Sequence, residues 1–213
     1  MNVLRRRGQP PYKLLSLLLQ YPSEELLAAR EAMGEAIEAL PSTPAREALL
    51  RFFGRYGTAP AIELQQEYVE TFDLQRRCAL YLTFYAEGDT RKRGMALLRL
   101  KRLYSAAGLP MEGSELPDYL PAMLEFAALA PAWHGRRLLA EHRAGLEVLR
   151  MGLHERRSPY LDLVEVICSD LPRLGAGELE RLRRLAVDGP PAEEVGLQPF
   201  APPEVMPARE ARR

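Results

Sequence analysis

The sequence has little of what marks several common protein classes. Only Cys78 and Cys168 of its 213 residues are cysteine, too few for a disulfide-stapled scaffold. No run reaches the 18 apolar residues that a membrane-spanning helix needs. Net charge is also absent, because 29 basic residues balance 29 acidic ones. No overall field therefore draws the chain to nucleic acid or to an anionic membrane.

An export signal is not predicted either. Three arginines at residues 5–7 precede an apolar stretch, but that stretch covers only residues 14–19. Acidic Glu24 and Glu25 follow it without a small-residue cleavage site. We therefore expect a cytoplasmic protein whose two cysteines remain reduced thiols.

The motifs of common enzymes are missing. No Glu-x-x-His pair offers di-iron ligands, and the two cysteines lie 90 residues apart without the closely spaced partners that zinc requires. No phosphate-binding glycine loop or Gly-x-Ser-x-Gly element is present. His142 and both cysteines are interpreted as core residues, although Arg76 and Arg77 could lower the pKa of the Cys78 thiol. We predict no catalytic residue, no metal site and no permanently bound cofactor.

Hydrophobic spacing is helical throughout, and no alternating run of β-branched residues indicates a strand. The predicted fold is all-α, a single bundle-like domain of eight or nine helices over residues 1–188. Ser23, Thr43 and Asp89 are the expected N-caps. Residues 73–88 are interpreted as helix followed by loop. The other expected helices cover residues 12–20, 23–40, 43–57, 60–72, 90–107, 117–129, 131–154, 159–171 and 177–187.

Two further predictions concern the helix at residues 90–107 and the end of the chain. Leu97, Leu100 and Tyr104 form one apolar stripe, and Met95 with Leu98 forms another, so a central helix is expected. Residues 189–213 hold six of the 18 prolines and no periodic apolar face, so a flexible proline-rich tail is expected there.

Charge is segregated along the neutral chain. Glu63, Glu67 and Glu70 fall at i, i+4 and i+7, with Asp73 at the end, and no nearby basic residue neutralises them. We call these four residues the acidic ridge. Residues 73–102 then carry eight basic side chains against three acidic ones. Both clusters are explained equally by solvated faces, but aromatic residues lie between them, as in a groove that binds a peptide. These aromatic residues are Tyr68, Phe72, Tyr81, Phe84 and Tyr85.

Two blocks carry a specific resemblance. They read YVETFDLQRRCALYLTFYAEGDTRKRGMALL at residues 68–98 and ELPDYLPAMLEFAAL at residues 115–129. The chain resembles the NarJ-type assembly chaperones of respiratory nitrate reductase, in the group of redox-enzyme maturation chaperones related to TorD and DmsD. The opening YKLLSLLLQYPSEEL resembles them more weakly.

The resemblance implies an all-α, non-enzymatic chaperone. Its client would be the molybdenum catalytic subunit of respiratory nitrate reductase, bound by the N-terminal segment. The client, and not the chaperone, would receive molybdopterin guanine dinucleotide and an iron-sulfur cluster before it docks on the membrane. No nucleic acid and no direct membrane insertion are implied.

The resemblance also implies a peptide groove lined by residues 68–73, with charged side chains at its edge. Glu115, Pro117 and Asp118 match a family element in which several relatives have His where this chain has Tyr119. An apolar wall opposite would be formed by Leu116, Leu120 and Leu124, although their three- and four-residue spacing is explained equally well by core positions. The predicted client-binding residues are Glu63, Glu67, Tyr68, Glu70, Thr71, Phe72, Asp73, Arg76, Arg77, Tyr81, Tyr85, Asp89, Arg91, Arg93, Glu115, Pro117, Asp118, Leu120 and Leu124.

Such a groove would hold a basic, amphipathic client segment, so its affinity should fall with salt and at pH values that protonate the ridge. Three alternatives stay open: a chaperone of a related molybdoenzyme, a helical regulator that binds nucleic acid through residues 91–102, and a protein that binds the molybdopterin dinucleotide itself.

Overall fold

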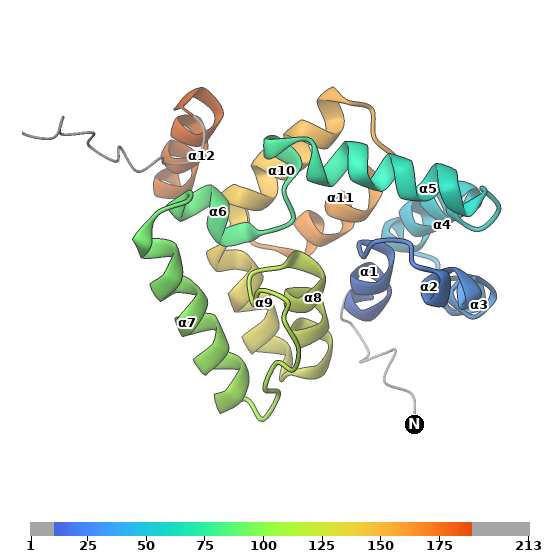
Figure 1. Cartoon of the computed structure of the whole chain (residues 1–213), viewed down its shortest axis with the longest axis horizontal. Coiled ribbons are helices and arrows are strands. Elements are labelled where there is room, and N and C mark those ends of the chain that lie inside the picture. Colours follow the sequence, from blue (N-terminus) through green and yellow to red (C-terminus); the bar gives the residue numbers. More distant parts are fainter. Residues whose placement is uncertain (1–10, 189–213) are drawn as a thin grey trace, which may run out of the picture.

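The computed structural model describes residues 11–188, and its secondary structure there is helical apart from one isolated antiparallel bridge between Tyr81 and Tyr119 (Figure 1). The predicted all-α fold is confirmed. The predicted tail at residues 189–213 lies outside the described residues. The α-helices are α1 Tyr12–Leu18, α2 Glu24–Ala28, α3 Arg30–Glu38, α4 Pro44–Tyr56, α5 Ala61–Tyr68, α6 Leu82–Glu87, α7 Arg91–Ala106, α8 Leu120–Leu129, α9 Ala132–Glu141, α10 Arg143–Glu155, α11 Leu161–Asp170 and α12 Ala176–Asp188. A π-helix over Val69–Asp73 continues α5, and Arg76–Cys78 forms a 3₁₀ turn.

Two of the predicted N-caps are confirmed. The Ser23 hydroxyl accepts the Leu26 N–H at 3.3 Å, and the Thr43 hydroxyl accepts the Arg46 N–H at the same distance. Each hydroxyl satisfies one of the amides that the first turn of a helix leaves without a partner. Pro44 in the first turn of α4 has no N–H to lose and a backbone already shaped for a helix.

Two helices predicted as continuous are broken in the structure. These two breaks, together with the separate helix α6, bring the α-helices of residues 11–188 to twelve, against the eight or nine predicted. The first break is at Ala29 (φ −87°, ψ 7°) and the second at His142 (φ −104°, ψ 16°). Neither residue is a helix breaker, so local propensity gave no signal. Tertiary packing explains the second break, because α9 packs on α8 whereas α10 packs on α6, α11 and α12 (Figure 1).

The predicted order of residues 73–88 is wrong. The extended segment and the 3₁₀ turn come first, and the helix, α6, follows. Asp89 is also not the N-cap of α7. Thr90 takes that position, and the Asp89 carboxylate instead accepts a hydrogen bond from Arg93 at 3.3 Å.

The predicted central position of α7 is wrong as well. Its buried side chains are Leu100 and Tyr104, whereas Met95 is 67% exposed and Leu98 is 40% exposed. The helix lies at one edge of the molecule (Figure 1). Its basic side chains explain this, because burying unpaired charges costs far more than exposing two apolar residues.

The core is continuous through the described helices. Helix α1 packs on α8, where the buried Ser16 hydroxyl donates to the Pro121 carbonyl at 2.8 Å, and α4 packs on α11. The Tyr160 ring packs against the rings of Phe52 and Phe72, with centroid distances of 5.1 and 4.7 Å. No helix among residues 11–188 is long and apolar enough to cross a bilayer.

Gly135 tests the tight packing of α9 on α8. A Cβ built on Gly135 would lie 2.3 Å from the Ala127 Cα, a backbone atom that cannot move aside alone. We expect Gly135→Ala to lower the free energy of unfolding by about 2 kcal/mol or more, measured by urea denaturation.

The matched control is Gly54→Ala in α4, where an added Cβ meets nothing within 4 Å. Alanine favours the helix, so this variant should gain about 0.5–1 kcal/mol. Equal effects of the two substitutions would contradict the close approach of α8 and α9.

Buried tyrosines predict a loss of stability in alkali. Burial raises the pKa of Tyr12, Tyr68, Tyr85, Tyr104 and Tyr160 above the ordinary value. The folded state keeps these protons while the unfolded state releases them near pH 10, so stability is full below about pH 10 and falls as the pH rises beyond it. Absorbance titration should show these tyrosinates appearing only with unfolding, in step with loss of helical circular dichroism. Their appearance in a fully helical protein would contradict the prediction.

Candidate functional site

The acidic ridge is only partly free. Glu63 and Glu70 are exposed, but both carboxylate oxygens of Glu67 accept from the Arg55 guanidinium, at 2.6 and 2.5 Å. The prediction that no basic residue neutralises the ridge is therefore wrong. Arg55 lies near the end of α4, and the short connection to α5 brings it beside Glu67.

The aromatic residues of the predicted groove lie mostly in the core. Tyr68, Phe72 and Tyr85 are buried, and the rings of Tyr68 and Phe72 pack 4.8 Å apart. The Tyr68 hydroxyl is within hydrogen-bond distance of the Tyr119 hydroxyl at 2.9 Å and the Leu19 carbonyl at 3.3 Å. Thr71, Leu120 and Leu124 are buried as well. These side chains hold the helices together, and a client would reach them only after a rearrangement.

Asp118 is the most buried charged residue of the predicted site, with an exposed fraction of 0%. Its carboxylate accepts the Thr83 N–H at 3.2 Å and the Thr83 hydroxyl at 2.5 Å. Its backbone carbonyl accepts the Leu82 N–H at 3.0 Å. Asp118, in the segment before α8, thereby accepts hydrogen bonds from two backbone amides in the first turn of α6. It takes the place of a local N-cap, although it belongs to a different segment of the chain.

Arg93 lies between the buried Asp118 carboxylate and the exposed Asp89 carboxylate. Its guanidinium lies 3.4 Å from the Asp118 carboxylate and 3.3 Å from that of Asp89, and 5.9 Å from the Tyr81 ring centroid. The Tyr81 hydroxyl donates to Glu115 at 3.3 Å, and burial together with this carboxylate raises the pKa of Tyr81 to about 12. The structure thus brings Tyr81, Asp89, Arg93, Glu115 and Asp118 together, a set we call the charged junction.

The remaining predicted residues surround the junction or face away from it. Arg76 lies 3.9 Å from Asp89, whereas Arg77 pairs with Glu155 of α10 at 3.4 Å. The Pro117 carbonyl accepts the Tyr104 hydroxyl at 2.7 Å. Asp73 is exposed, as is Arg91 at the first position of α7.

The suggestion that nearby arginines lower the pKa of Cys78 is wrong. The thiol is buried against Gly152 and the backbone of residue 77, and this burial raises its pKa. Cys168 is buried too, and its pKa is raised to about 11. Neither thiol has the lowered pKa of a reactive cysteine. Within residues 11–188, no three His, Cys, Asp or Glu side chains are placed to hold a metal ion.

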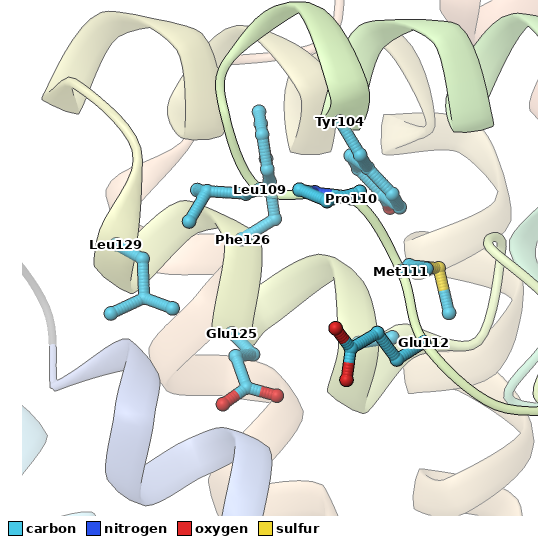
Figure 2. A pocket seen from close by; sticks show the side chains of 9 residues that line it. Tyr104, Leu109, Pro110, Met111, Glu112, Glu125, Phe126 and Leu129 are labelled. Carbon is cyan, nitrogen blue, oxygen red and sulfur yellow. The ribbon is translucent and has the colours of Figure 1, made fainter.

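A groove that the sequence analysis missed lies between α8 and the segment after α7 (Figure 2). We call it the α8 groove. Its volume is about 230 Å³, room for one or two apolar side chains. Its walls are mainly apolar, and the carboxylates of Glu112 and Glu125 lie at one end (Figure 2). It is lined by Tyr104, Leu109, Pro110, Met111, Glu112, Ala122, Glu125, Phe126 and Leu129.

Lys13 of α1 reaches Glu125, so one of the two carboxylates is already paired. Glu112 is exposed and lies in the connection between α7 and α8. The signal available in the sequence was the apolar run Leu109, Pro110 and Met111 immediately before that glutamate. Only the fold places this run opposite α8.

An all-α domain with an apolar groove edged by carboxylates has the properties of a module that binds a protein segment. Comparison with known proteins identifies the family. The chain belongs to the nitrate reductase delta subunit family, whose model matches residues 30–165.

Two relatives and one solved structure illustrate the similarity. The nitrate reductase molybdenum cofactor assembly chaperone NarJ of Bacillus subtilis is 35% identical over 84% of this chain and 96% of its own. NarJ of Escherichia coli is 33% identical over 72% of this chain and 66% of its own. A crystal structure described as a redox enzyme maturation protein of Archaeoglobus fulgidus superimposes with a TM-score of 0.57, at 25% identity, over 78% of this chain and 96% of that one.

These findings confirm the family resemblance of residues 68–98 and 115–129, both of which lie within the matched region. These two relatives are named as assembly chaperones and not as enzymes, in agreement with the prediction of a non-enzymatic chaperone.

We use the contacts of the charged junction to predict how Asp118→Asn changes the stability of the protein. The amide keeps one acceptor for Thr83 but removes the charge that faces Arg93, whose side chain is only 18% exposed. We expect a loss of about 2 kcal/mol in the free energy of unfolding.

The matched control is Asp89→Asn, which removes the other carboxylate beside Arg93 but at a side chain that is 68% exposed. Its effect should stay within about 0.5 kcal/mol. If both substitutions cost the same in urea denaturation, the buried carboxylate is not what holds α6 to the segment before α8.

Proposed function

We propose that this protein is an assembly chaperone of a nitrate reductase and acts on the molybdenum-containing catalytic subunit. The observation that carries the proposal is the similarity to NarJ of Bacillus subtilis over 96% of that protein. In this proposal the chaperone works in the cytoplasm and binds the N-terminal segment of the client. The client stays competent to receive molybdopterin guanine dinucleotide and an iron-sulfur cluster before it docks on the membrane. The chaperone itself retains neither group.

The α8 groove supports a physical mechanism for this binding. An amphipathic segment would place an apolar side chain between Met111 and Phe126, while a neighbouring Lys or Arg meets Glu112. Glu125 is available only through its second oxygen or by displacement of Lys13. The groove thus combines apolar burial with a carboxylate edge, the combination that the sequence analysis expected near the acidic ridge.

The exposed carboxylates Glu63, Glu70 and Asp73 would attract the client segment and would not hold it. Their aromatic neighbours are buried, so they offer charge without an open apolar slot. Surface charge of this kind speeds the encounter with a basic segment more than it holds the bound segment, and its effect is screened by salt.

The client is tested by purifying the tagged chaperone from cells that express the whole nitrate reductase. The expected result is copurification of the catalytic subunit, and loss of that copurification when its N-terminal segment is deleted. Recovery of a different molybdoenzyme would replace the proposed client with that enzyme. Recovery of the catalytic subunit regardless of its N-terminus would contradict the proposed binding segment.

The groove is tested by titrating the N-terminal peptide of the catalytic subunit into the chaperone, followed by calorimetry. Met111→Arg places a positive charge where an apolar side chain would bind, so we expect at least a roughly tenfold weaker affinity. Glu112→Gln should weaken binding by a few-fold and flatten its salt dependence. Circular dichroism should show both variants as helical as the parent chain.

The matched control is the double variant Glu63→Gln with Glu70→Gln on the acidic ridge. It removes two exposed carboxylates without touching the α8 groove. We expect the equilibrium affinity of the ridge variant to change less than twofold, with a slower association rate. A large loss in the ridge variant together with full affinity of Met111→Arg would move the binding site to the ridge.

A further inference from the structure

The exposed side of α7 concentrates positive charge in a chain that is neutral overall. The helix carries six basic residues and no acidic one, namely Arg91, Lys92, Arg93, Arg99, Lys101 and Arg102. Arg93 is paired within the charged junction. Lys92, Arg99, Lys101 and Arg102 form no ion pair or side-chain hydrogen bond with any other described residue between positions 11 and 188. Charge of this density attracts a partner with carboxylates.

Apolar side chains stand among these charges. Met95 and Leu98 of α7 are exposed, and Trp133 of α9, the only tryptophan of the chain, is 61% exposed. Two hollows adjoin them. One, of about 370 Å³, is lined by Glu87, Lys92, Met95, Ala96, Leu98, Arg99 and Arg102, and the other, of about 330 Å³, by Arg99, Leu100, Leu103, Trp133, His134, Arg137, Leu138, Glu141 and His142.

Arg99 borders both hollows, which makes them parts of one surface, the α7–α9 face. The chemistry of this face specifies its occupant. An exposed tryptophan ring beside a hollow suits proline-rich segments, which dock on aromatic side chains in the extended polyproline conformation. Arginine is the residue best suited to grip carboxylates with paired hydrogen bonds. The face therefore fits a segment that is proline-rich, apolar and acidic.

Such a segment exists in this chain. Residues 189–207 read GPPAEEVGLQPFAPPEVMP, with six prolines and the acidic residues Glu193, Glu194 and Glu204, and without a basic residue. They include a Pro-x-x-Pro element from Pro199 to Pro202 that encloses Phe200. We propose that residues 189–207 dock on the α7–α9 face, with the proline element against Trp133 and the glutamates against the free basic side chains of α7.

The chain is long enough for this contact. Helix α12 ends at Asp188 and lies at the same end of the molecule as α6, which leads into α7 (Figure 1). In a polyproline conformation, 19 residues span about 59 Å, whereas the 16 residues of α7 extend over about 24 Å. The segment can therefore follow the whole helix and still reach α9.

Docking within one chain has a regulatory consequence. A tethered segment acts at an effective concentration in the millimolar range, so an outside partner binds the face only by displacing it. This inference does not rest on the proposed function or on the α8 groove.

The first test uses Trp133 fluorescence, because a single tryptophan reports on this face alone. Two variants of the full chain are compared with the parent. One is the triple variant Glu193→Gln, Glu194→Gln and Glu204→Gln, and the other is the double variant Pro199→Ala and Pro202→Ala. Each variant should raise acrylamide quenching of Trp133 roughly twofold by uncovering the indole ring. The control is Glu210→Gln, which lies beyond the segment and should change nothing. Quenching that is equal in all four proteins would overturn the proposal.

The second test locates the segment directly. A spin label is attached to the Ala201→Cys variant, where it reacts selectively because both native cysteines are buried. The label should broaden the Trp133 indole resonance and the amide resonances of α7, but leave the amide resonances of α3 sharp. Broadening elsewhere, or none, would overturn docking on this face. A mixture of spin-labelled chains and separate isotope-labelled chains tests for contact between two copies. Broadening seen only in this mixture would assign the occupant to a second copy and overturn the intramolecular arrangement.

Discussion

The arrangement of the candidate site depends on one buried carboxylate. Asp118 lies just before α8, and it bonds the first turn of α6 through both its side chain and its backbone. Arg93 of α7 faces the same carboxylate. Three helices are therefore positioned by a single charged group that water does not reach. Removing either partner of such a pair leaves an unpaired charge in a region of low polarity, which costs more than the pair itself contributes.

This junction explains why α7 lies at the edge of the molecule and faces outwards. Arg93 is the one basic residue of α7 that faces both a buried and an exposed carboxylate. The other basic side chains must remain in water, so α7 can bury only the face with Leu100 and Tyr104. The same constraint leaves Met95 and Leu98 on the surface and creates the α7–α9 face. At the end of the helix, the chain turns back along α8 and forms the α8 groove.

Charge segregation gives the molecule two surfaces of opposite character despite its neutral total. The α8 groove has carboxylates at one end, and the α7–α9 face is basic. A basic client segment and an acidic proline-rich segment would thus bind to different places. Two sites of opposite sign reduce competition between these segments, because each site repels the ligand of the other.

The sequence by itself determined the helical class, the caps at Ser23 and Thr43, and the family, because all three follow from local patterns. Motif residues such as Glu115 and Asp118 were also identified from the sequence, but their packing was not. Only the tertiary structure decided that His142 interrupts a helix, that Arg55 neutralises Glu67, and that Tyr68 and Phe72 belong to the core. It also placed residues 109–112 opposite α8. These features depend on contacts between residues distant in the chain, and helical periodicity shows which side chains share a face without showing what that face meets.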